Sequence, residues 1–142
     1  QIMKTTLALI TTLLISQNAI ARDCETKVEI NVYSSQVGMP APQSVSLDDS
    51  KRIGRIAKAM EQVGYQITEN NDPALTAKIE AGIERGEEQS ELFSHVQIIS
   101  RKGKVLFDGY KNRKIAKDKE KDLEEISAFI KRHLKNDLPI CQ

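Results

Sequence analysis

The sequence predicts an α+β fold: a two-layer sandwich in which a mostly antiparallel sheet of four to five strands carries two helices on one face. Three observations predict it. Apolar and polar residues alternate in several short stretches, two longer stretches repeat apolar residues at helical spacing, and short turns join most neighbouring strands. Each predicted helix has a single apolar stripe, so both should cover the same face of the sheet. The expected order is β-α-β-β-β-β-α.

The first half of the predicted domain contains a strand, a loop and a helix. Residues 27–33 alternate strictly, with three aliphatic side chains on one face: Val28, Ile30 and Val32. A loop is expected at 36–43, because its two prolines forbid a helix. The helix should begin at Ser46, whose hydroxyl can cap it with Asp48 and Asp49 in the first turn, and should end at Gly64.

The second half is predicted to be mainly strands. In order we expect a short strand at 65–68, a long strand at 75–84, an acidic loop at 86–91, strands at 93–100 and 105–110 joined by a tight turn at Lys102 and Gly103, a lysine-rich segment at 111–121, and a last helix. The helix has an apolar stripe: Leu123, Ile126, Ile130 and Leu134. No internal repeat or linker divides the region, which is long enough for one core and too short for two.

The first 21 residues have the composition of a secretory signal peptide. A lone lysine, an apolar run and the small-residue site Ala19-Ile20-Ala21 follow one another in the required order. The apolar run is shorter than the roughly 20 residues that span a bilayer. We therefore expect residues 1–21 to be removed, with Gln1 and Ile2 as extra leading residues, leaving one domain at 22–142 without a transmembrane segment. The expected location is periplasmic or secreted, in a Gram-negative bacterium.

The two cysteines, Cys24 and Cys141, lie near the two ends of the expected domain. In an oxidising compartment such a pair indicates a disulfide bond. Two free thiols or an intermolecular bridge are the alternatives. Two cysteines and two distant histidines have no metal-ligand spacing, so no metal site is expected.

The charges are balanced overall but unevenly distributed. Without residues 1–21 the chain has 20 basic and 20 acidic residues, which argues against a nucleic-acid partner. Residues 101–121 have a net charge of +6 and residues 69–91 a net charge of −5. The candidate interaction surface consists of Arg101, Lys102, Lys104, Tyr110, Lys111, Arg113 and Lys114. It could bind an envelope protein or an anionic lipid or lipopolysaccharide surface. Alternatively, these charges only aid solubility.

No pattern in the chain indicates catalysis. His95 falls on the outward face of its strand and His133 lies late in the last helix, so both are expected to be surface or helix-capping residues. There is no serine-nucleophile motif and no phosphate-binding glycine loop. Adjacent carboxylates such as Glu87 and Glu88 are expected to be solvated. The chain is therefore predicted to be no enzyme and to use no cofactor.

Three stretches together resemble a known group of proteins: residues 55–65, a helix ending in Gly-Tyr; residues 71–79, with Asp-Pro-Ala before a long strand; and residues 96–109, a hairpin around Lys-Gly-Lys. This series is similar to small bacterial envelope domains related to the amino-terminal domain of TolB, the LpoB-type lipoproteins and DUF4136. The resemblance implies a non-catalytic α/β domain that docks onto other envelope proteins. It implies no site residues.

Two functions remain from the sequence. The first is a non-catalytic periplasmic interaction or accessory domain that binds another protein of the cell envelope. The second is a secreted inhibitor or immunity protein that blocks a periplasmic hydrolase or toxin. An inhibitor would need a protruding loop, for which residues 34–45 or 86–92 are the candidates.

Overall fold

The fold was analysed in a computed structural model, which describes residues 23–36, 38, 41–45, 47, 50–116 and 122–142. The predicted signal peptide, the capping residues Ser46, Asp48 and Asp49, and the last lysines of the basic segment lie outside the described residues. The described elements are β1 (Glu25–Gln36), β2 (Gln43–Val45), α2 (Ser50–Glu61), β3 (Gln66–Ile67), β4 (Leu75–Arg85), β5 (Gln89–Ser100), β6 (Val105–Ala116) and α3 (Asp122–Asp137).

One mixed sheet contains all of these strands, in the order β2-β1-β4-β5-β6, with β3 paired to the start of β1. β1 is parallel to β4 and β3, and the other three pairings are antiparallel. The predicted α+β class and the antiparallel majority are confirmed. The sheet also contains β2, a three-residue strand at the end of the segment expected to be a loop, where Val45 lies opposite Val32.

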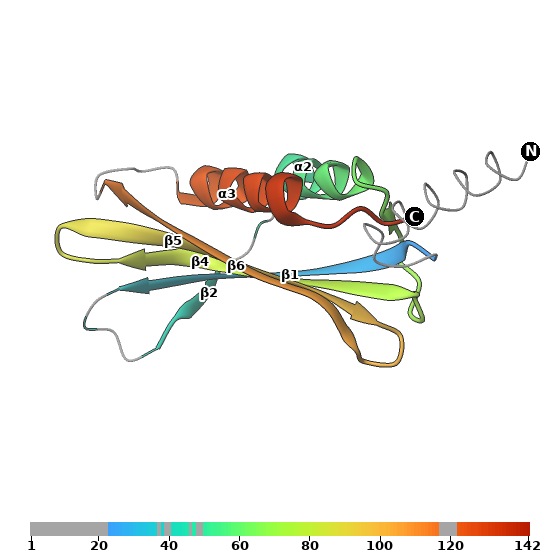
Figure 1. Ribbon diagram of the computed structural model, residues 1–142. Helices are drawn as coiled ribbons and strands as arrows, with labels where there is room; N and C mark the ends of the chain where they lie inside the picture. Colours follow the sequence, from blue (N-terminus) through green and yellow to red (C-terminus); the bar gives the residue numbers. More distant parts are fainter. Residues whose placement is uncertain (1–22, 37, 39–40, 46, 48–49, 117–121) are drawn as a thin grey trace, which may run out of the picture.

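Both helices lie on the same side of the sheet, as predicted (Figure 1). The inward side chains of β4 and β5 alternate with outward ones and are almost completely buried, as at Ile79 and Ile98. The apolar stripes of the helices pack on them; from α2 the stripe includes Ile56 and Met60, and from α3 it includes Ile130. Among the described residues, no element covers the opposite face of the sheet, and no helix has both the length and the apolar character to span a bilayer.

The β5–β6 hairpin is longer than the sequence suggested. The first strand was predicted to begin at residue 93 and the second to end at residue 110. In the structure β5 and β6 each have 12 residues, and they pair as far as Gln89 and Ala116. The lysine-rich segment at 111–121 was not assigned to a strand, and its residues 111–116 form the second half of β6. A strand at the edge of a sheet tolerates charged side chains on both faces, so this strand lacks the apolar alternation that reveals inner strands.

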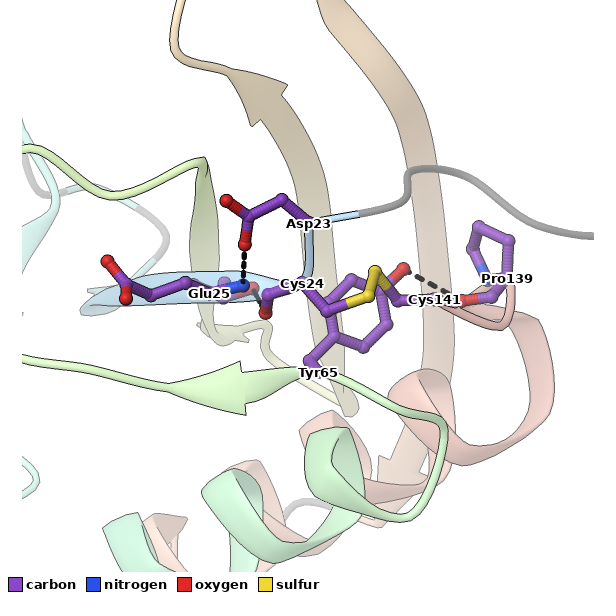
Figure 2. The surroundings of a disulfide bond; sticks show 7 residues. Asp23, Cys24, Glu25, Tyr65, Pro139 and Cys141 are labelled. Carbon is purple, nitrogen blue, oxygen red and sulfur yellow. Dashed lines mark hydrogen bonds between the residues drawn. A yellow bond between two sulfur atoms is a disulfide. The ribbon is translucent and has the colours of Figure 1, made fainter.

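The two ends of the described chain meet at one end of the sheet. Cys24 and Cys141 form the predicted disulfide, with their Cα atoms 5.9 Å apart (Figure 2). The buried Tyr65 donates a hydrogen bond from its hydroxyl to the Pro139 carbonyl at 2.7 Å, and burial raises the pKa of this phenol. The Cys141 amide donates to the Val63 carbonyl at 2.9 Å. These contacts fasten the carboxyl-terminal segment to the turn after α2 and to the start of β1.

Candidate functional site

The outer edge of β6 is a candidate binding feature of the sheet. β6 pairs with β5 along one side, and no described strand lies along its other side. In an antiparallel pair alternate residues direct their N–H and C=O groups away from the partner, so every second residue of β6 presents these groups at the edge. An irregularity in the pairing lies between Ile98 and Ile99, near the start of β6. From Asp108 to Ala116 the pairing is regular.

The seven predicted interaction residues do not form one patch. Arg101, Lys102 and Lys104 lie at the turn between β5 and β6, whereas the other four lie on β6. Lys111 follows Lys104 by seven positions, which corresponds to about 23 Å along a strand. The Arg101 guanidinium is also paired with the Asp72 carboxylate at 3.2 Å. The turn is therefore a separate surface, and the second half of β6 is the candidate site.

The second half of β6 presents cations on both faces of the sheet. Lys111 and Arg113 lie opposite the buried Ser94 and Leu92 of β5, which places them on the helix side. Tyr110 and Lys114 alternate with them and lie on the outer face, and all four side chains are exposed. The Lys111 ammonium is 3.2 Å from the Asp137 carboxylate of α3. A strand whose cations line both faces attracts anionic side chains on both faces.

A hollow of about 180 Å³ adjoins this edge on the helix side. It lies between β6 and α3 and is lined by Lys111, Phe129, Arg132, His133 and Asn136. Two cationic side chains and one amide line it together with an aromatic ring. Such a lining suits a short anionic or polar side chain better than an apolar one.

His133 is buried, so the prediction that it is a surface or helix-capping residue is wrong. Its side chain is 1% exposed, and its Nδ1 lies 2.8 Å from the Ser94 hydroxyl of β5. Its Nε2 has no hydrogen-bond partner among the described residues and lies 3.6 Å from the Asp137 carboxylate. Ser94 is completely buried, so this Ser-His-Asp row cannot present a nucleophile to a substrate. The row joins α3 to the sheet instead.

We expect His133 to make the fold sensitive to mild acid. Burial lowers the pKa of His133 below its ordinary value of 6.5, with Lys111 and His95 acting in the same direction and Asp137 opposing them. The unfolded chain then binds a proton near pH 6.5 that the folded chain binds only at lower pH, so the free energy of unfolding falls as the pH drops below about 6.5. Chemical denaturation at pH 7.5, 6.0 and 5.0 measures this loss.

The other histidine provides the control for that experiment. His95 lies on the outer face, as predicted, and its Nε2 is hydrogen-bonded to the Asp108 carboxylate, which also accepts from Gln97 at 3.3 Å. These hydrogen bonds lower the pKa of Asp108, a shift that matters only at a pH below that of the expected loss. The His133→Gln variant should lose most of the pH dependence between 7.5 and 5.0, and His95→Gln should keep most of it, because burial is the main cause of the lowered pKa of His133 and His95 a minor one. Equal pH profiles for the two variants would contradict the assignment.

The two segments that were candidates for an inhibitory loop, 34–45 and 86–92, are mostly strand or tight turn where the structure describes them. Residues 86–88 form a tight turn closed by the Gly86 amide, which donates to the Gln89 carbonyl at 3.0 Å. Within the other candidate loop, 34–45, the described residues belong mainly to the ends of β1 and β2. Neither segment is a long protruding loop in its described part. In the same described ranges no group of three or more histidine, cysteine or acidic side chains could hold a metal ion.

Comparison with known proteins finds similarity only among solved structures. No protein-family model matches the chain, and no curated protein matches it. One similar structure is the PelC dodecamer from Paraburkholderia phytofirmans, 12% identical, covering 87% of this chain and 93% of that chain with a TM-score of 0.46. Another is the lipoprotein GNA1162 from Neisseria meningitidis, 11% identical, covering 81% and 99% with a TM-score of 0.43. We draw no functional conclusion from likeness at this level.

Proposed function

We propose that this chain is a non-catalytic interaction domain of the bacterial cell envelope, which binds another envelope protein through the edge of β6. The observation that carries the proposal is the regular second half of that strand: no described strand pairs with its outer edge, and Lys111, Arg113 and Lys114 are exposed on it. An unpaired edge is a template for backbone pairing, and its cations favour an anionic partner.

Two further features support a place outside the cytoplasm. The Cys24–Cys141 disulfide is typical of proteins that fold in oxidising compartments such as the periplasm. Residues 1–21 have the order of charged, apolar and small residues that export requires. Both features agree with a partner in the envelope.

Site-specific photo-crosslinking in living cells tests the proposal. A photoreactive phenylalanine replaces Tyr110, which is 59% exposed on β6, and in a matched strain it replaces Ile53, which is 44% exposed on α2. We expect one discrete cross-linked product from position 110 that is absent from position 53, with the partner identified by mass spectrometry as an envelope protein. Identical products from both positions, or none from position 110, would contradict the proposal.

A further inference from the structure

We propose that the partner of this domain contributes an extended, acidic segment that adds to the sheet as a strand beside β6. This inference rests on the proposed function and identifies the kind of partner that the same site takes. It follows from three features of the second half of β6: the free backbone edge, the cations on both faces and the hollow under α3.

The backbone supplies the first part of the recognition. Among the described strands β6 lies at one edge of the sheet, and the regular pairing of residues 108–116 with β5 leaves a continuous run of alternate N–H and C=O groups on its other side. This segment contains no proline, so a new strand could pair with it throughout. Such strand addition provides affinity through main-chain hydrogen bonds regardless of the partner's sequence.

The cations select an acidic partner. Side chains of an added strand alternate between the two faces, so half of them lie beside Lys111 and Arg113 and the other half beside Lys114. Opposite charges at such cross-strand positions are favourable, and like charges are unfavourable. Two copies of this chain paired through this half of β6 would bring their own cations together. The charge pattern therefore disfavours a second copy and favours a segment rich in glutamate or aspartate.

The hollow between β6 and α3 can accept one side chain of the added strand. Strands in a sheet lie about 4.8 Å apart, so a helix-side residue of the added strand would stand next to Lys111, at the mouth of the hollow. Its volume of about 180 Å³ suits a single side chain, and Arg132 and Asn136, which line it together with Phe129, can donate hydrogen bonds to a carboxylate there. In strand addition, pockets for alternate side chains determine the sequence preference.

Synthetic peptides test the chemistry directly on the purified protein. The probe is a fluorescent ten-residue peptide of five glutamates and five threonines arranged in alternating pairs, which places glutamates on both faces of an added strand, and its binding is followed by anisotropy. One control has lysine in place of each glutamate. A second control keeps five glutamates but replaces the threonines by proline, which cannot form a strand ladder. We expect only the first peptide to bind. Equal binding of the proline peptide would show attraction by charge alone and would overturn strand addition.

Charge reversal locates the site. The double variant Arg113→Glu with Lys114→Glu should weaken binding of the glutamate peptide about tenfold, since it replaces two exposed attractions by two repulsions. The matched control reverses two exposed lysines on the helices, Lys58→Glu with Lys135→Glu, and should bind as the unchanged protein does. The net charge changes equally in both variants. Equal weakening in both would overturn the assignment to β6. Lys111 is left unchanged because it pairs with Asp137.

Amide hydrogen exchange distinguishes an added strand from other occupants. With the glutamate peptide bound, every second amide of residues 108–116 should exchange more slowly, because those amides become paired. Binding to phosphatidylglycerol vesicles in place of the peptide, or dimerisation that protects the same amides without it, would overturn the proposal. If crosslinking at Tyr110 identifies an envelope partner and this alternating protection is missing, strand addition fails while the interaction function stands. If the amides are protected by the peptide but crosslinking finds no partner, the proposed function fails instead.

Discussion

Replacing both Cys24 and Cys141 by alanine is expected to lower the free energy of unfolding by about 4–5 kcal/mol. The bridge joins residues 117 positions apart, so it closes almost the whole described chain into one loop. In the chain-entropy description, a crosslink that closes a loop of this size lowers the conformational entropy of the unfolded state. The free energy of the unfolded state is thereby raised by about 4–5 kcal/mol. Alanine is the suitable replacement because both cysteines are buried and a buried hydroxyl costs free energy unless it is hydrogen-bonded.

The contacts around the disulfide should keep the variant folded, so the lost stability should appear as a lower denaturant midpoint. Tyr65 still donates to the Pro139 carbonyl and the Cys141 amide position still donates to Val63, so the folded structure at this end of the sheet should persist. We therefore expect the variant to be folded at low temperature and to unfold cooperatively at a lower denaturant concentration. Urea titration measures the difference. The reduced, unchanged protein should match the variant, and a loss below about 1 kcal/mol in both would contradict the prediction.

The sequence predicted the elements whose pattern follows from burial against a second layer. The stripe of α2 and the alternation of β4 are consequences of a one-sided sheet covered by two helices. The disulfide was predicted differently, from an even pair of cysteines near the two ends of an exported domain. The second half of β6 could not be found in this way. Two of its helix-side residues, Lys111 and Arg113, are exposed cations, so the apolar period that would mark a buried strand is interrupted there.

His133 is a different case, because the sequence did contain a signal for its burial. It follows Ile126 by seven residues and Ile130 by three, which places it on the same face of α3 as these two buried residues. Ser94 precedes Val96 by two residues in β5, so it shares the inward face. An inward histidine on the helix and an inward serine on the strand share one hydrogen bond, between Nδ1 and the hydroxyl. Only apolar residues were assigned to the core from the sequence, so the contact between His133 and Ser94 was not predicted.

Substitution of Gly82 by valine is expected to destabilise the fold by about 3 kcal/mol or more. Propensity alone predicts the opposite, because glycine weakens the interior of a strand and valine favours it. In the structure, however, Gly82 lies in β4 between Tyr33 of the parallel β1 and Phe93 of β5. A Cβ at this position would overlap the Tyr33 carbonyl group, with its carbon at 2.9 Å, and would lie 3.0 Å from the Phe93 ring.

The backbone contact sets the size of this effect. The Phe93 ring could rotate away, but the Tyr33 carbonyl belongs to a ladder that is paired from Thr26 to Gln36, so relief requires moving one central strand against another. Overpacking that forces backbone shifts costs about 1–3 kcal/mol, and the added methyl groups of valine place this case at the upper end. Urea titration of the purified variant measures the loss.

Gly54 is the matched control, because it is also a glycine inside an element. It lies on the exposed side of α2, and a Cβ there would meet nothing within 4 Å. Gly54→Ala should therefore stabilise the protein by about 0.5–1 kcal/mol through helix propensity. Opposite signs for the two substitutions would show that the close approach of β1 and β4 requires a glycine at position 82. If Gly82→Val were neutral or stabilising, the parallel pairing of β1 and β4 would be wrong, and with it the strand order that leaves β6 at the edge.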